Sequence, residues 1–170
     1  MVAEKKNIYI VDGAGFYYRA FYGMKTELTN KDNIPTNAIY GFVKVLHKLI
    51  EEQNPYGIVI ALDSKEKTFR HELYSNYKSS RPQMPDDLAV QLPYIYEAIS
   101  ALNIPTLKLE RFEADDIIGT VAAKIDKSLY NLIIVSSDKD MLQCLDSDSV
   151  KILDPMKNRY LGDADALKKF

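Results

Sequence analysis

The segment NIYIVD (residues 7–12) is an apolar run that ends in a carboxylate. Two further segments have the same form, GIVIALD (residues 57–63) and NLIIVSSD (residues 131–138). Short apolar runs bounded by polar or turn residues are typical of buried strands. If the strands are parallel, their carboxyl ends meet at one edge of the sheet, where α/β proteins bind ligands. The sequence therefore predicts that three aspartates gather at this edge: Asp12, Asp63 and Asp138.

Helical patterns alternate with these strand-like runs along the chain. In TNAIYGFVKVLHKLIEEQ (residues 36–53), apolar residues recur at i, i+3, i+4 and i+7, with Thr36 as a suitable N-cap. Pro93 is expected to kink or split a second helix over residues 86–103. The remaining predictions are helices over residues 15–23, 113–128 and 138–145, strands over residues 105–110 and 149–154, and a short helix ALKKF capped by Asp163.

The alternation predicts an α/β fold with a mostly parallel central sheet flanked by helices. The chain has 170 residues, 46% of them hydrophobic, which suits one domain with a buried core. No apolar run reaches the roughly 18 residues of a membrane span, and the N-terminus lacks a signal-peptide pattern. The single cysteine, Cys144, permits no disulfide framework and is expected to be a small buried residue. We therefore expect a cytoplasmic protein.

Further acidic residues are concentrated in two motifs. EADDIIG (residues 113–119) begins a predicted helix, and SSDKDMLQ (residues 136–143) follows a predicted strand. Acids in a first helical turn are common caps, which would explain one or two of them. Caps do not explain three acids followed directly by an apolar helix face, so metal binding is favoured. The acids of the two motifs are Glu113, Asp115, Asp116, Asp138 and Asp140.

With Asp12 and Asp63, these residues make seven carboxylates at the predicted edge, which repel one another unless protons or cations neutralise them. Oxygen-only ligands select hard divalent ions, Mg²⁺ or Mn²⁺, and the set predicts a metal-dependent enzyme acting on phosphates. The net charge is −2, but without these seven the bases outnumber the acids by five, which is compatible with a nucleic-acid substrate. Asp154 also ends a strand-like run, but nothing else supports it, and we interpret it as a turn residue.

A basic segment follows the second strand, and we call residues 64–85 the gateway segment. It interleaves Arg70, Lys78 and Arg81 with Tyr74 and Tyr77, a pattern that suits a nucleic-acid backbone and stacked bases. The alternative is a solvated helix whose tyrosines pack inward.

Outside the gateway segment, Arg19 follows the aromatic cluster Phe16–Tyr18. It could hold a phosphate or merely pair with an acid. The aromatic cluster that continues to Tyr22 is expected to be mostly core. Neither His47 nor His71 is predicted to be a metal ligand.

At this point the motifs resemble those of a known family, the 5′-nuclease domain of bacterial DNA polymerase I within the flap endonuclease group. The order and spacing are similar over essentially the whole chain. The motifs are VDGxxxxYRAF, YGF, LDSKxKTFRHELYxxYKSSRPxMPDDL, EADDIIGT and SSDKDMLQ.

The resemblance implies a PIN-like, 5′-nuclease fold with a basic helical gateway over the site. It implies a metal-dependent 5′-3′ exonuclease and flap endonuclease that hydrolyses DNA phosphodiesters in primer removal and repair. Two ions, Mg²⁺ or Mn²⁺, would lie about 4 Å apart across the scissile bond. The implied metal ligands are Asp12, Asp63, Glu113, Asp115, Asp116, Asp138 and Asp140. The implied catalytic cations are Lys78 and Arg81, and the implied substrate contacts are Arg19, Arg70 and Tyr77.

The resemblance also implies partners and domain organisation. Residues 1–170 would form the catalytic domain, ending before a helix-turn-helix DNA-binding region that carries two more aspartates. The implied partner is DNA with 5′ flaps, nicks or RNA-primed ends, with a polymerase possibly fused in the parent protein. A monomer without membrane contacts is expected.

Three other functions stay open at this stage. The first is a branched-DNA binding module that does not cleave. The second is another metal-dependent phosphohydrolase that acts on small esters, although the aspartyl-phosphate type would need an Asp two residues after Asp12. The third is a ribonuclease with a similar acidic edge, against which the basic, tyrosine-rich gateway segment argues.

Overall fold

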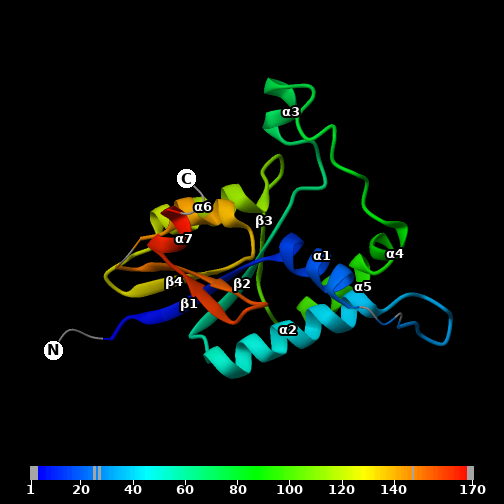
Figure 1. Cartoon of the computed structure of the whole chain (residues 1–170), viewed down its shortest axis with the longest axis horizontal. Coiled ribbons are helices and arrows are strands. Elements are labelled where there is room, and N and C mark those ends of the chain that lie inside the picture. The colour runs from blue at the N-terminus through cyan, green and yellow to red at the C-terminus, as the bar shows by residue number, and fades with distance from the viewer. Residues whose placement is uncertain (1–3, 25, 27, 147, 168–170) are drawn as a thin grey trace.

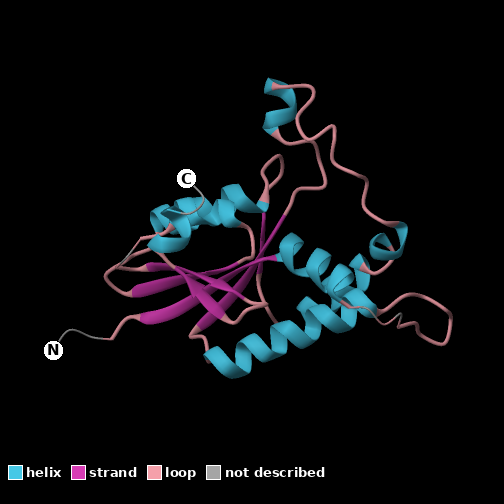
Figure 2. Ribbon diagram, viewed as in Figure 1, coloured by secondary structure: helices cyan, strands magenta, loops and turns pink. Residues whose placement is uncertain are grey.

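The computed structural model describes residues 4–24, 26, 28–146 and 148–167. Its centre is a six-stranded sheet in the order β3-β2-β1-β4-β5-β6, shown in magenta in Figure 2. Strands β1 to β5 are parallel, and β6 runs antiparallel to β5. The strands are β1 (Lys6–Asp12), β2 (Gly57–Leu62), β3 (Thr106–Lys108), β4 (Tyr130–Val135), β5 (Val150–Asp154) and β6 (Arg159–Leu161).

Helices cover both faces of the sheet, so the fold has three layers (Figure 1). On one face, Tyr9 and Val11 of β1 pack against α1 (Gly13–Gly23), α2 (Asn37–Gln53) and α5 (Leu92–Ala101). On the other face, the intervening residue Ile10 packs against a second group of elements. These are α6 (Ala114–Lys124), the 3₁₀ helix η1 (Lys139–Cys144) and α7 (Asp163–Leu167). The predicted α/β fold with a mostly parallel sheet is confirmed.

The predicted interruption of the helix over residues 86–103 is also confirmed. It is split into α4 (Asp86–Ala89) and α5, with Pro93 in the first turn of α5. Gln91, at the break, is completely buried, and its side-chain oxygen accepts hydrogen bonds from the backbone N–H of Ala38 (2.8 Å) and Ile39 (3.2 Å). Thr36 occupies the N-cap position of α2 but makes no side-chain cap, because Gln91 supplies the acceptor.

The gateway segment is helical only at α3 (Phe69–Leu73). After α3 the chain runs through a series of turns, and Lys78 has a positive φ of 55° that a helix does not allow. In Figure 1 this segment stands away from the sheet, between the end of β2 and α4. The expectation of a helical gateway is therefore wrong for most of residues 64–85, which lack a continuous apolar face to support a helix.

Other differences are local. Helix α1 begins at Gly13 rather than residue 15, because the Asp12 carboxylate caps its N-terminus. Strand β6 was not predicted, and Cys144 is half-buried rather than buried. Helix α7 ends at Leu167 in the described chain, and the rest of the predicted ALKKF helix lies outside the described residues. Among the described residues, no helix is long and apolar enough to cross a membrane.

Replacing glycine by alanine at two helix positions should have opposite effects on stability. A Cβ at Gly13 would lie 2.9 Å from the Ala61 carbonyl oxygen, whereas a Cβ at Gly119 in α6 would meet nothing within 4 Å. Gly13→Ala should lower the free energy of unfolding by about 1–3 kcal/mol through overpacking. Gly119→Ala should raise it by up to about 1 kcal/mol through helix propensity. Urea unfolding of both variants tests the pair, and equal shifts of the same sign would contradict this packing.

Candidate metal centre

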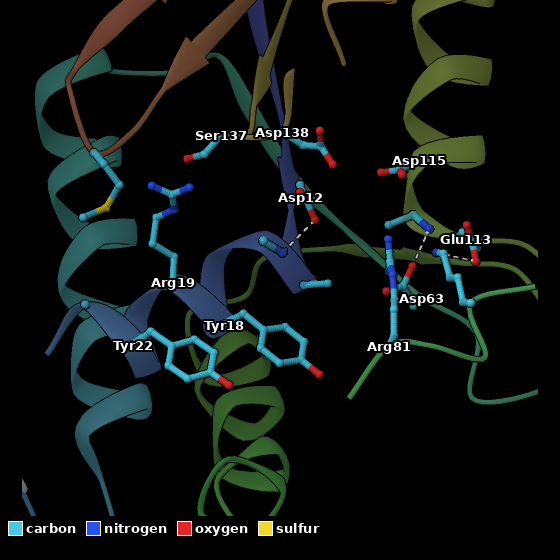
Figure 3. Close-up of a pocket in the computed structure, with 16 residues that line it drawn as sticks. Asp12, Tyr18, Arg19, Tyr22, Asp63, Arg81, Glu113, Asp115, Ser137 and Asp138 are labelled. Atoms are coloured by element: carbon cyan, nitrogen blue, oxygen red, sulfur yellow. Dashed lines mark hydrogen bonds and ion pairs between the residues drawn. The ribbon is translucent and has the colours of Figure 1, made fainter. Parts of the chain in front are cut away.

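A cavity of about 680 Å³ opens at the carboxyl edge of the sheet (Figure 3). Its floor lies where β1 and β4 are neighbours and the strand order reverses, a point at which α/β folds bind ligands. Five of the seven predicted metal ligands line the cavity: Asp12, Asp63, Glu113, Asp115 and Asp138. Three of the predicted cations, Arg19, Lys78 and Arg81, line it too.

Asp12 is the most buried of the cavity acids, with 6% of its surface exposed. Its carboxylate accepts hydrogen bonds from the Gly15 N–H and the Ser136 hydroxyl, both at 2.9 Å. Burial raises the pKa of Asp12, and the charges of Asp63 and Asp138 raise it further, although the two hydrogen bonds oppose the shift. A bound cation would favour the ionised form that burial disfavours.

Asp63 follows β2, and Asp115 lies in the first turn of α6. The Asp63 carboxylate accepts a hydrogen bond from the Ala114 N–H (2.8 Å), which connects the end of β2 to the first turn of α6. Asp115 still contacts solvent, but partial burial and the charges of Asp12, Asp138 and Asp63 raise its pKa to about 6. The negative charges of the cavity acids therefore repel one another.

Glu113 is the N-cap of α6, and only 8% of its surface is exposed. Its two carboxylate oxygens accept hydrogen bonds from the gateway segment, one from Lys78 Nζ (2.7 Å) and the other from the Tyr77 hydroxyl (3.1 Å). A predicted catalytic cation and a predicted stacking residue are therefore both hydrogen-bonded to a predicted metal ligand.

Asp116 and Asp140 are absent from the cavity wall. Both Asp116 oxygens accept hydrogen bonds from Arg70, at 2.6 and 2.7 Å, and one also accepts from the Glu113 N–H (3.0 Å). The hydrogen bonds from Arg70 lower the pKa of Asp116. Asp140 lies in η1, where its N–H donates to the Asp138 carboxylate that caps this short helix.

Asp154 also lies away from the cavity wall, in agreement with its interpretation as a turn residue. Its carboxylate accepts hydrogen bonds from the backbone N–H groups of Met156 and Lys157 in the following turn.

The cavity includes side chains that the sequence did not identify as functional. Tyr18 and Tyr22 line it as a stacked pair, with ring centroids 6.5 Å apart, although the aromatic cluster was expected to be mostly core. Tyr22 is largely exposed, and in Figure 3 the Arg19 side chain extends from the same helix away from the two rings, toward Ser137. Their i, i+4 spacing with Arg19 between them is the signal that could have identified this wall.

The donor set fits a hard divalent cation, because the cavity acids provide only oxygen ligands. No three carboxylate, His or Cys side chains are already arranged around a single metal position in the described part of the chain. Glu113, for example, directs its carboxylate oxygens to Lys78 and Tyr77.

The raised pKa of Asp115 predicts that the stability of the fold depends on pH. Its folded-state pKa of about 6 lies above the ordinary 3.8, so the native state binds more protons between these values and stability falls as pH rises. Asp115→Asn should therefore stabilise the metal-free protein at pH 7.5 by about 1 kcal/mol, a value reduced for solvent screening. The gain should vanish near pH 4.

Thermal unfolding at the two pH values measures this effect. Asp87→Asn, at an exposed site away from the cavity, is the control and should show no pH-dependent gain. An Asp115→Asn gain of equal size at both pH values would exclude the electrostatic explanation.

Relatives of known name match most of this chain. A 5′-3′ exonuclease from Aquifex aeolicus is 41% identical over 165 residues, which are 97% of this chain and 56% of that protein. DNA polymerase I from Caldicellulosiruptor bescii is 43% identical over 141 residues, which are 83% of this chain and 16% of that protein. The chain thus spans about half the length of the exonuclease relative and a small part of the polymerase.

Solved structures share the fold at lower sequence identity. T5 5′-exonuclease with bound zinc ions aligns with a TM-score of 0.72 and 21% identity over 96% of this chain and 60% of that one. A bacteriophage T5 flap endonuclease in complex with DNA and metal ions aligns with a TM-score of 0.69 and 18% identity, with the same coverage. The family model for the 5′-3′ exonuclease N-terminal resolvase-like domain matches residues 7–170. The chain therefore belongs to the 5′-3′ exonuclease family and contains its N-terminal resolvase-like domain.

Proposed function

We propose that this protein is a divalent-metal-dependent 5′-3′ exonuclease and flap endonuclease that hydrolyses phosphodiesters of DNA. The observation that carries the proposal is the cavity, where carboxylates from four separate segments face cations from α1 and the gateway segment. This combination suits a phosphate held between metal ions and basic side chains. The names of the relatives support the same chemistry, since they are a 5′-3′ exonuclease and DNA polymerases.

In this proposal the cavity acids hold two divalent ions, either Mg²⁺ or Mn²⁺. Asp12, Asp63, Glu113, Asp115 and Asp138 would be the ligands, and Asp140, two residues after Asp138 in η1, would be a further one. When bound, the ions supply an activated water as nucleophile and neutralise charge on the leaving oxygen. Solved relatives contain divalent ions, which supports metal dependence without fixing the identity or number of the ions.

The cations of the chain would bind and stabilise the phosphate. Arg19 and Arg81 already face the cavity, whereas Lys78 must exchange Glu113 for the substrate phosphate. Lys78 and Arg81 would neutralise charge that develops on the phosphate in the transition state. Tyr77, once its hydroxyl leaves Glu113, would stack near the scissile nucleotide.

The substrate and the wider organisation are part of the same proposal. The DNA would carry 5′ flaps, nicks or RNA-primed ends, and residues 1–170 would form the catalytic domain of a monomeric cytoplasmic protein. The DNA polymerase I relatives support a polymerase fused to a domain of this kind.

The proposal predicts metal-dependent cleavage of a labelled 5′-flap duplex. The chain should cleave it with Mg²⁺ or Mn²⁺ and not with EDTA, and Asp115→Asn should remove cleavage because a metal ligand is lost. Asp87→Asn, at an exposed site outside the cavity, should cleave normally. Flap binding without cleavage at saturating metal would instead indicate a branched-DNA binding module. Equal cleavage by the Asp115 variant would contradict the assigned site.

Lys78 should act mainly on the chemical step. Lys78→Met should lower the single-turnover rate about a hundredfold, as for other removed transition-state donors, and change DNA affinity less than threefold. Lys151→Met removes an exposed lysine of β5 outside the cavity and should change neither value. A variant that loses affinity but keeps its rate would show that Lys78 only binds DNA.

A further inference from the structure

We infer that Asp116 is not a metal ligand but a positioning residue: paired with Arg70, it fastens the gateway segment to α6 and orients Glu113. This inference rests on the proposed metal site, and it separates Asp116 from the carboxylates that line the cavity. It also removes Arg70 from the predicted phosphate contacts.

The carboxylate of Asp116 is already occupied by donors. Arg70 Nη1 donates to Oδ2 at 2.7 Å and Nη2 donates to Oδ1 at 2.6 Å, the two-point geometry in which arginine binds carboxylates most strongly. The same Oδ2 accepts the Glu113 N–H at 3.0 Å. Both side chains are largely covered, with 31% of Arg70 and 20% of Asp116 exposed. Metal coordination by Asp116 would have to break this paired arrangement.

The hydrogen bond to the Glu113 N–H gives Asp116 a positioning role. The Asp116 carboxylate accepts the Glu113 N–H (3.0 Å), and the Asp116 N–H donates to the Glu113 carbonyl oxygen (3.1 Å), so the two residues together close the first turn of α6. The cap fixes the backbone from which the Glu113 side chain enters the cavity. Residues that orient a metal ligand in this way commonly affect metal affinity without touching the ion.

The pair with Arg70 also anchors the gateway segment near its first helix. The Arg70 guanidinium lies over the Phe69 ring, 4.7 Å from its centroid, and Phe69 contacts Phe112 with centroids 5.5 Å apart. The Phe69 N–H donates to the Arg111 carbonyl oxygen (3.1 Å). Lys78 and Tyr77, by contrast, donate their side-chain hydrogen bonds to Glu113, so these bonds can break while Arg70 keeps its two hydrogen bonds to Asp116. Arg70 also lies 3.8 Å from Glu113, as a longer ion pair.

The test measures Mn²⁺ affinity by titration calorimetry in charge-matched variants. Arg70→Gln with Asp116→Asn removes both charges and keeps an oxygen that can accept from the Glu113 N–H. This double variant should bind Mn²⁺ within about threefold of the wild type, whereas Asp115→Asn, which removes a ligand, should bind about a hundredfold more weakly. Arg70→Gln with Asp116→Ala also removes the acceptor and should bind about tenfold more weakly than the Asn version.

Two results would overturn the inference. A double Gln–Asn variant as weak as Asp115→Asn would make Asp116 a ligand, and equal affinities of the Asn and Ala versions would remove its positioning role. A wild-type protein that binds no Mn²⁺ would contradict the proposed function instead.

Hydrogen exchange tests whether the Arg70–Asp116 pair anchors the gateway segment. This test needs no metal and uses a more conservative substitution. Arg70→Lys keeps the charge but loses the two-point contact, and it should speed backbone exchange over residues 69–81. The control Lys65→Arg, at an exposed residue earlier in the same segment, should not change exchange there. Unchanged exchange in Arg70→Lys would show that the pair does not hold the gateway segment.

Discussion

Repulsion among carboxylates at one edge of a parallel sheet is the constraint on which the rest of the structure depends. Parallel strands place their carboxyl ends together, so Asp12, Asp63 and Asp138 cannot avoid one another. Local hydrogen-bond donors limit the cost of this repulsion. The Ser136 hydroxyl and Gly15 N–H support Asp12, and the Ala114 N–H supports Asp63. The remaining cost appears as raised pKa values at Asp12 and Asp115.

The first turn of α6 connects this constraint to the gateway segment. Glu113 accepts hydrogen bonds from Lys78 and Tyr77, and in the proposed mechanism it would also bind metal, so metal and gateway segment would compete for one carboxylate. By linkage, a cation that bound Glu113 would weaken its hydrogen bond to Lys78, and a phosphate that bound Lys78 would free Glu113. The Arg70–Asp116 pair would keep the segment attached during this exchange.

The fold was largely predictable because its central strands are continuous apolar runs with few alternatives. Strand β6 (residues 159–161) was not predicted because it is short and mostly exposed, so its sequence shows no pattern of buried residues. Helix α1 was predicted to start late because Gly13 and Gly15 indicated a turn, whereas the Asp12 carboxylate supplies a cap. The gateway segment was expected to be helical from its resemblance, but no apolar face of its own supports a helix there.

The candidate site was predictable in its acids and cations but not in their pairing. Strand ends and first helical turns are recognisable in sequence, which gave the five acids of the cavity wall. The pairing of Asp116 with Arg70 joins residues 46 positions apart, and no local pattern reports it. The exposure of Tyr22 also depends on how α1 meets α2, which periodicity in a short aromatic cluster does not reveal.

Anomalous scattering from crystals of this chain soaked in Mn²⁺ would show whether the cavity acids bind a divalent ion. We expect anomalous peaks inside the cavity, at about 2.2 Å from oxygens of Asp12, Asp63, Glu113, Asp115 or Asp138. We also expect that the Arg70–Asp116 pair remains intact beside them. A fully occupied crystal with no peak in the cavity, or with Mn²⁺ bound only elsewhere, would contradict the proposed metal site.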